Sequence, residues 1–97
     1  MLLTWPPKDP NDRLDYKLDW SVWLAAETND TIETSEWFIA VIGPGTATLV
    51  KDSDDNTTSS TSIWLSGGSV GQIYLITNRI TTAGGRIKDQ SARVKIV

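Results

Sequence analysis

The last third of the chain, Ser62–Val97, is the part of the sequence that most restricts the possible folds. It contains three runs of β-forming residues, which are Ser62–Ser66, Gln72–Thr82 and Arg86–Val97. Gly84-Gly85 separates the second run from the third, and glycine adopts the positive φ angles of a tight turn without a Cβ clash. We therefore expect an antiparallel hairpin here, preceded by one further strand.

The register of this hairpin decides which side chains face the core, because a slip of one residue moves every side chain to the opposite face. A two-residue loop places Ala83 opposite Arg86, and a three-residue loop with a bulge places Ala83 opposite Ile87. The first arrangement gathers on one face Ile73, Leu75, Val94 and Ile96. The second gathers on one face Tyr74, Ile76, Asn78, Ile80, Gln90, Ala92, Val94 and Ile96.

The segment Gly71-x-x-Tyr74-x-Ile76 favours the second register. It resembles the tyrosine corner of immunoglobulin-like sandwiches, in which a tyrosine at the start of the penultimate strand bonds to nearby backbone. The residue two positions later enters the core. We therefore expect Tyr74, Ile76 and Val94 to be core residues.

The segment Arg13–Trp20 has the clearest alternation of apolar and charged residues. One face carries Leu14, Tyr16, Leu18 and Trp20, and the other carries Asp15, Lys17 and Asp19. This period of two predicts a half-buried strand with a solvated outer face. Asp15 and Asp19 could be read as paired catalytic carboxylates. Lys17 lies between them, so we interpret the three as a surface charge ladder.

The middle of the chain predicts a helical turn and an apolar strand. Ser21–Ala26 fits one helical turn that begins with Ser21 as its cap. Thr34–Ile42 predicts a strand in the middle of a sheet, and Trp37 is our candidate for the inter-sheet tryptophan of the third strand. Ile39 and Val41 would share its face. The sequence leaves open the opposite choice, with an inward face of Phe38, Ala40 and Ile42.

The region Thr46–Ser60 changes character halfway along. Thr46–Lys51 predicts a strand, and the acidic, hydroxyl-rich segment Asp52–Ser60 predicts a loop. Its aspartates lack the glycine and the closing bidentate glutamate that calcium loops carry at fixed spacing. We therefore interpret this segment as a solvated tip rather than a cation site.

The strand that follows alternates Ile63 and Leu65 with Trp64. We expect Ile63 and Leu65 to face inward and Trp64 to face outward. An outward tryptophan is covered by a neighbouring segment or belongs to a contact surface, and both possibilities stay open. The chain as a whole predicts about seven short strands with turns near every tenth residue, which is typical of an all-β, immunoglobulin-like antiparallel β-sandwich.

The beginning of the chain predicts an extended segment, because Pro6-Pro7 disfavours helix. We divide the chain into an extended arm and turn over residues 1–12 and a single sandwich domain over residues 13–97. Trp5 either packs against the edge of the sandwich or reaches a neighbouring subunit together with the two prolines. The short apolar start carries no basic region, so we expect no signal peptide.

Composition narrows the classes of function. A chain of 97 residues supports one hydrophobic core. It has no cysteine and no histidine, so disulfides, thiolate sites and most catalytic triads and zinc sites are excluded. A net charge of −3 argues against a nucleic-acid partner. No run of about eighteen apolar residues is present to span a membrane. We expect no enzyme activity, no cofactor and no metal site.

Three stretches of the sequence carry a family pattern. Their motifs are Lys8-Asp9-Pro10, Leu14-Asp15-Tyr16, Asp19-Trp20 followed by Trp23-Leu24, the apolar strand around Trp37, Trp64–Gly68, Tyr74 and Asn78–Thr82. Each motif is short, but their order and spacing over nearly the whole chain resemble a family of small tailed-phage virion proteins of the fibre–tail adaptor type.

The resemblance implies a structural role in a phage or prophage particle, as an adaptor between tail or baseplate and fibres. It implies other tail proteins as partners, multiple copies in an assembled ring, residence in the virion, and assembly in the bacterial cytoplasm. Our candidate partner contacts are Trp5, Pro6, Pro7 and Trp64. The alternative hypothesis is a carbohydrate-binding module for host surface glycan, in which Trp64 stacks on a sugar ring and Asp52–Asp55 bind hydroxyl groups.

Overall fold

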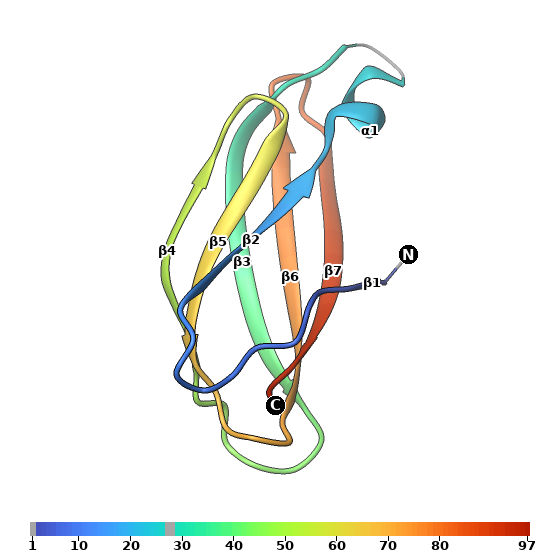
Figure 1. The fold of residues 1–97 in the computed structure, drawn as a ribbon. Helices are drawn as coiled ribbons and strands as arrows, with labels where there is room; N and C mark the ends of the chain where they lie inside the picture. The colour runs from blue at the N-terminus through green and yellow to red at the C-terminus, as the bar shows by residue number, and fades with distance from the viewer. Residues whose placement is uncertain (1, 27–28) are drawn as a thin grey trace.

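A computed structural model describes residues 2–26 and 29–97 as two β-sheets packed face to face. Figure 1 shows β2, β5 and β4 lying in front of β3, β6 and β7, with the one short helix at the end of β2. The all-β sandwich expected from the sequence is confirmed. The elements in these residues are β1 (Leu3–Thr4), β2 (Leu14–Asp19), α1 (Ser21–Ala25), β3 (Ile32–Ile42), β4 (Leu49–Asn56), β5 (Ser60–Gly67), β6 (Ile73–Thr82) and β7 (Ile87–Lys95).

The strand order is that of an immunoglobulin-like sandwich. One sheet has the order β2-β5-β4 and the other has the order β1-β7-β6-β3, with β1 parallel to β7. The expectation that the strand of Trp37 lies in the middle of a sheet is wrong, because β3 is an edge strand. The next strand, β4, pairs with β5 in the opposite sheet, so no described strand pairs with the outer edge of β3. At the start of that edge, the N–H of Ile32 donates to the carbonyl oxygen of Thr58 at 2.9 Å.

The hairpin of β6 and β7 has the expected inward face but a different register. Thr82, rather than Ala83, marks the end of the pairing, since its N–H donates to the carbonyl oxygen of Arg86. Tyr74 consequently lies opposite Val94, and Ile76 lies opposite Ala92. This is a shift of two positions from the favoured register, because the loop is Ala83-Gly84-Gly85 rather than one that includes Arg86. A shift of two preserves the faces.

The core lies between the sheets and follows the predicted alternation. Leu14 and Trp37 are partly buried and pack against it. The buried apolar side chains are Trp5, Tyr16, Leu18, Trp20, Leu24, Ile32, Leu49, Ile63, Leu65, Tyr74, Ile76, Ile80, Ala92, Val94 and Ile96.

A buried amide joins the two sheets through polar contacts. The Oδ1 atom of Asn78 accepts hydrogen bonds from Trp20 Nε1 at 3.1 Å and from the Thr61 hydroxyl at 2.7 Å. Its Nδ2 atom donates to the Ser35 hydroxyl and to the carbonyl oxygen of Glu36, both at 2.9 Å. Buried polar groups are costly unless paired, so this fully bonded amide fixes how the sheets meet.

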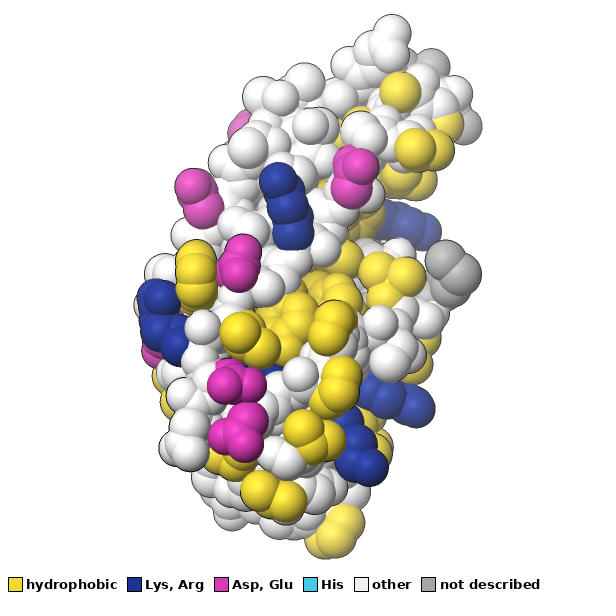
Figure 2. Space-filling view, viewed as in Figure 1, with side chains coloured by type: hydrophobic (Ala, Val, Ile, Leu, Met, Phe, Trp, Pro, Cys, Tyr) yellow, Lys and Arg dark blue, Asp and Glu magenta, His cyan; other side chains and the backbone are white. Residues whose placement is uncertain are grey.

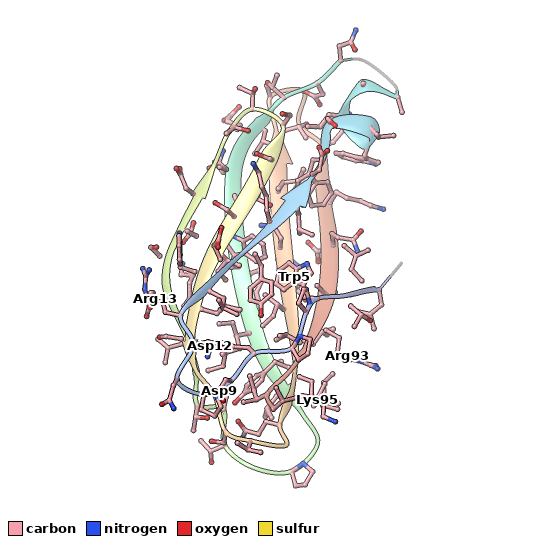
Figure 3. All side chains as sticks on the ribbon, viewed as in Figure 1. Trp5, Asp9, Asp12, Arg13, Arg93 and Lys95 are labelled. Carbon is pink, nitrogen blue, oxygen red and sulfur yellow. The ribbon has the colours of Figure 1, made fainter. Side chains whose placement is uncertain are left out.

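The N-terminal segment is packed on the domain. The N–H of Trp5 donates to the carbonyl oxygen of Arg93 at 2.9 Å, and its indole stacks on Tyr16 with ring centres 4.7 Å apart. The Tyr16 hydroxyl donates to the carbonyl oxygen of Pro6 at 3.0 Å, and burial raises the pKa of this phenol. Figure 3 shows Trp5 where the chain leaves β1, in front of β6. Only 8% of the surface of Trp5 is exposed, which favours the alternative in which it packs against the edge of the sandwich.

Lys8 is buried immediately after this segment. Its Nζ atom donates to the carbonyl oxygens of Asp9 at 2.9 Å and of Gly67 at 2.6 Å, and its backbone pairs with the strand end at Ile96. The following turn is closed by Asp9 Oδ1, which accepts from the N–H of Asn11 at 2.8 Å. The Lys-Asp-Pro motif thus ties the start of the chain to the ends of β5 and β7.

The Gly67-Gly68 pair at the end of β5 is fixed by close contacts. Both residues have positive φ angles. A Cβ atom on Gly67 would lie 2.7 Å from the carbonyl oxygen of Thr48, and one on Gly68 would lie 2.8 Å from Ile96. The N–H of Thr48 also donates to the Tyr74 hydroxyl at 2.9 Å. Tyr74 therefore binds backbone, as its resemblance to a tyrosine corner predicted, but the partner lies on the approach to the opposite sheet.

The acidic segment after Lys51 is a strand and not a loop. β4 continues to Asn56 with a bulge between Lys51 and Ser53, and the turn occupies only the next three residues. Both faces of this edge strand are solvated, so the strand lacks the apolar alternation on which the prediction relied. In residues 2–26 and 29–97, no three acidic side chains are grouped closely enough to hold a metal ion.

Asp30 connects the segment after α1 to the tip of the β6–β7 hairpin. Its carboxylate accepts from the N–H of Gly84 at 2.9 Å and from Arg86 Nε at 3.3 Å. Hydrogen bonding to Thr82, followed by the backbone N–H groups of Thr31 and Gly84, lowers the pKa of Asp30 to about 2. The helix itself begins after Asp19, whose Oδ1 accepts from the N–H of Ser21, so Ser21 is not its cap.

The depressed pKa of Asp30 predicts a pH-dependent contribution to stability. A carboxyl group with a lowered folded-state pKa stabilises the fold above its ordinary pKa, near 3.9, and loses that contribution as the pH falls toward 2. We expect Asp30→Asn to lower the urea midpoint at pH 6, and the gap to wild type to close between pH 5 and pH 2. A gap that is constant over this range would contradict the prediction.

Candidate contact surface

Trp64 lies on the outer face of β5 but is covered by its own chain. The guanidinium carbon of Arg13 lies 4.4 Å from the ring centre, and Arg13 Nε is 2.8 Å from Asp52 Oδ2. The other carboxylate oxygen of Asp52 accepts from the Ser66 hydroxyl at 2.8 Å. Trp64 therefore faces outward as expected, but its ring face is occupied. This arrangement favours the alternative in which Trp64 is covered by a neighbouring segment of its own chain.

The remaining predicted surface residues are separated from one another. Pro6 and Pro7 are exposed beside the buried Trp5. Asp15 and Asp19 lie on the solvated face of β2 with Lys17 between them. The carboxylate Oδ1 of Asp19 accepts from Ser21, which lowers the pKa of Asp19. The predicted residues therefore do not converge on one site.

The outer face of the four-stranded sheet carries a surface that the sequence analysis did not identify. Ala40 on β3 lies opposite Leu75 on β6, and Ile42 lies opposite Ile73. Phe38 continues the row on β3. Phe38 is 44% exposed and Ile42 is 43% exposed. We name these five side chains, Phe38, Ala40, Ile42, Ile73 and Leu75, the apolar strip. No element of the described chain covers it, because the other sheet packs on the opposite side.

Basic residues border the apolar strip on β7. Arg93 lies opposite Leu75, and Lys95 lies opposite Ile73. Neither forms an ion pair with any carboxylate in the part of the chain that the structure describes. Figure 3 shows both side chains on β7, on the opposite side of the view from Arg13. The strip is therefore an apolar surface with a positively charged margin.

An ion pair closes the end of the strip at Phe38. Arg79 Nε lies 2.8 Å from Asp89 Oδ1, and the guanidinium carbon lies 5.2 Å from the Phe38 ring centre. The hydrogen bonds between these side chains raise the pKa of Arg79 and lower the pKa of Asp89. Both groups are exposed, so the pair orients the side chains more than it stabilises the fold.

A sequence signal for this surface does exist. Trp37–Ile42 is a run of six apolar residues on one strand. Such a run supplies apolar side chains to both faces of a sheet. Trp37, Ile39 and Val41 pack toward the core, so the intervening residues face outward. The two sets are therefore not alternatives for one buried face, because one faces the core and the other forms the apolar strip.

The geometry defines the class of this protein. It is a small immunoglobulin-like β-sandwich whose most distinctive surface is an uncovered apolar sheet face, which is typical of a protein-contact module. Residues 8–95 match the family model described as podophage GP4 fiber-tail adaptor protein gp77, and the chain belongs to this family. The match confirms the resemblance found in the sequence.

The family match establishes the general role. The chain is a structural fibre–tail adaptor of a phage, which places it among virion proteins that interact with other tail and fibre proteins. No curated protein matches the sequence. No helix in the described residues has the length and apolar character needed to cross a membrane.

Proposed function

We propose that the protein joins a tail component to a fibre by docking its apolar strip against another virion protein. The observation that carries this proposal is the row of paired apolar side chains on the outer face of β3 and β6. Burying apolar surface contributes about 25 cal/mol per Å² removed from water. The strip is the part of the outer sheet surface where docking would gain the most from this effect.

The charge at the margin indicates the chemistry of the partner. Arg93 and Lys95 border the strip beside Leu75 and Ile73, whereas the carboxylates on this sheet face, Glu36 and Asp89, lie on either side of Arg79 at the Phe38 end. An apolar partner surface with an acidic border would complement both features. We therefore assign the strip to a different virion protein whose contact surface has this composition.

Copy number and place of assembly extend the proposal. We propose that multiple copies act together in a ring, because avidity allows each contact to be weak. Assembly would take place in the bacterial cytoplasm before the particle is complete. Pro6 and Pro7 are exposed and stay predicted partner contacts. The carbohydrate-binding alternative has no supporting observation, since Arg13 covers the ring of Trp64.

The double substitution Phe38→Ser with Ile42→Ser tests the proposal. It removes apolar surface at exposed positions, so the melting temperature should change little. Incorporation into particles should fall by about tenfold or more, since roughly 1.4 kcal/mol of lost contact energy is a tenfold change in affinity. Quantitative mass spectrometry of purified particles measures the incorporation.

Val50→Ser with Val70→Ser is the matched control. Both valines are exposed, and neither lies in the apolar strip. This control should be incorporated as wild type. Equal incorporation of the two double variants would contradict the proposal. Sedimentation of the purified wild-type protein as a dimer that the strip variant abolishes would assign the strip to a second copy instead.

A further inference from the structure

The upper half of β7 has an open edge. β6 covers one side of this strand along its whole length, from Ile87 to Lys95. On the other side, β1 pairs only with Ala92 and Arg93. The part of β7 from Ile87 to Asp89 therefore has no strand on this side among the described residues.

The backbone groups at this open edge point outward. Trp5 N–H donates to Arg93 O and Lys8 N–H donates to Lys95 O, so the odd-numbered residues of β7 direct their polar groups to the β1 side. The pattern alternates along a strand. Ile87 and Asp89 therefore present N–H and C=O groups at the same edge, in line with β1. An unpaired row of this kind is a template for an added strand.

An apolar pocket lies beside this edge. It has a volume of about 550 Å³ between β2, α1 and β7, and its apolar lining includes Leu18, Trp20 and Trp23. Leu3 of β1 forms one end, and Val22, which is 82% exposed, lies at its rim. Figure 2 shows hydrophobic side chains gathered below α1 on this side of the molecule, next to a basic side chain.

The charged residues that line the pocket indicate which kind of ligand it would bind. Lys17 and Lys88 both line it, and neither forms an ion pair within residues 2–26 and 29–97. Asp19 is the one carboxylate among the lining residues that the structure describes. The lining therefore carries an excess of positive charge over an apolar floor. A segment with alternating apolar residues and carboxylates at its ends would complement all three parts of this site. Its apolar side chains would contact the floor of the pocket, its carboxylates would pair with the lysines, and its backbone would bond to the open edge of β7.

We propose that an extended, acidic-ended segment of a partner protein adds to β7 at Ile87–Asp89 as a further strand in line with β1. Alternate apolar side chains of this segment enter the pocket, while its backbone pairs with the open edge, as in other strand-addition complexes. This site adjoins the apolar strip only through Asp89, which pairs with Arg79 at the end of the strip, and it does not depend on the function proposed for the strip. An adaptor with both sites has two distinct surfaces for two partners.

A synthetic peptide tests the proposal on the whole chain. The probe is acetyl-Glu-Thr-Val-Thr-Val-Thr-Glu-amide, in which the glutamates and valines share one face of the strand. The control has proline in place of the second valine, which removes a donor and disrupts the strand. We expect the probe to bind about tenfold tighter than the control or better, by tryptophan fluorescence titration. Hydrogen exchange of the Ile87 and Asp89 amides should slow in the presence of the probe.

Charge substitutions at the pocket rim provide a second measurement. Val22 is highly exposed, so Val22→Glu and Val22→Lys should both fold. We expect Val22→Glu to weaken probe binding by about tenfold, and Val22→Lys to preserve or improve it. The Phe38→Ser with Ile42→Ser variant should bind the probe as wild type does, which separates this test from the test of the apolar strip.

Three outcomes would overturn the proposal. They are equal binding of the probe and the proline control, unchanged exchange of the Ile87 and Asp89 amides at saturating probe, and equal effects of glutamate and lysine at position 22. None of them bears on the incorporation of the strip variant.

Discussion

Replacing Trp5 with alanine is expected to lower the free energy of unfolding by about 3–5 kcal/mol, as for other large-to-small changes of buried aromatic residues. The indole stacks on Tyr16 and contacts Trp37 with ring centres 6.2 Å apart, so it joins the N-terminal segment to both sheets. A domain of this size has a total stability of about 5–15 kcal/mol. The loss should be visible as a large decrease in the urea midpoint, measured by circular dichroism.

Trp64→Ala is the matched control for this experiment. It deletes the same side chain from a partly exposed position on the outer face of β5. We expect a clearly smaller loss of stability than for Trp5→Ala. Similar losses for the two variants, or a stable Trp5→Ala protein that fails only in particle assembly, would restore Trp5 as a partner contact.

Asn78→Ala is expected to be the second large effect. It leaves the carbonyl oxygen of Glu36 without this donor and deprives Trp20 Nε1 and the Thr61 hydroxyl of their shared acceptor. A buried polar group that loses its partner costs about 1–3 kcal/mol. We expect a total loss of about 3 kcal/mol in the free energy of unfolding, measured by urea denaturation.

A neighbouring residue supplies the control for Asn78. Thr77→Ala removes a hydroxyl that pairs with Ser91 at 2.8 Å on the outer face of the same strand. Its effect should be several times smaller, because its partner can bond to water. A double-mutant cycle with Trp20→Phe should give a coupling energy well above zero. Additive effects of the two substitutions would show that the amide does not hold the tryptophan.

The fold could be predicted from the sequence because its strands carry local signals. The alternation in β2 and in β6 selected the correct inward faces, and burial of Tyr16 and Tyr74 follows from it. The register of the β6–β7 hairpin was missed by two positions. The register depends on which residue of β6 is the last to pair with β7. The alanine and glycine residues of the loop allow the pairing to end at several positions, and in the structure it ends at Thr82.

Other features could not be predicted because they depend on distant partners. Pro6 and Pro7 correctly indicated an extended segment, but its pairing with Arg93 involves the far end of the chain. The acidic second part of β4 is solvated on both faces, so only its neighbour β5 identifies it as a strand. Asn78 reads as an isolated polar residue in a strand until Trp20 and Thr61 are placed beside it.

Identifying the candidate surface requires knowing which side chains are buried, and residue type alone does not show this. The two tryptophans chosen as contacts are a buried residue, Trp5, and one shielded by Arg13. The apolar strip consists of ordinary aliphatic residues and one phenylalanine. They become distinctive only because nothing else in the described chain lies over that face.

The pairing of β1 with β7 has a consequence for synthesis on the ribosome. The two strands come from opposite ends of the domain, so the sandwich can close only after the last strand has left the exit tunnel. Until then, β7 is not available to pair with β1, so Trp5 and Tyr16 lack part of the structure that buries them. Such incompletely folded species expose apolar surface and associate readily. Chaperone capture should therefore be strongest late in translation and should end once β7 emerges.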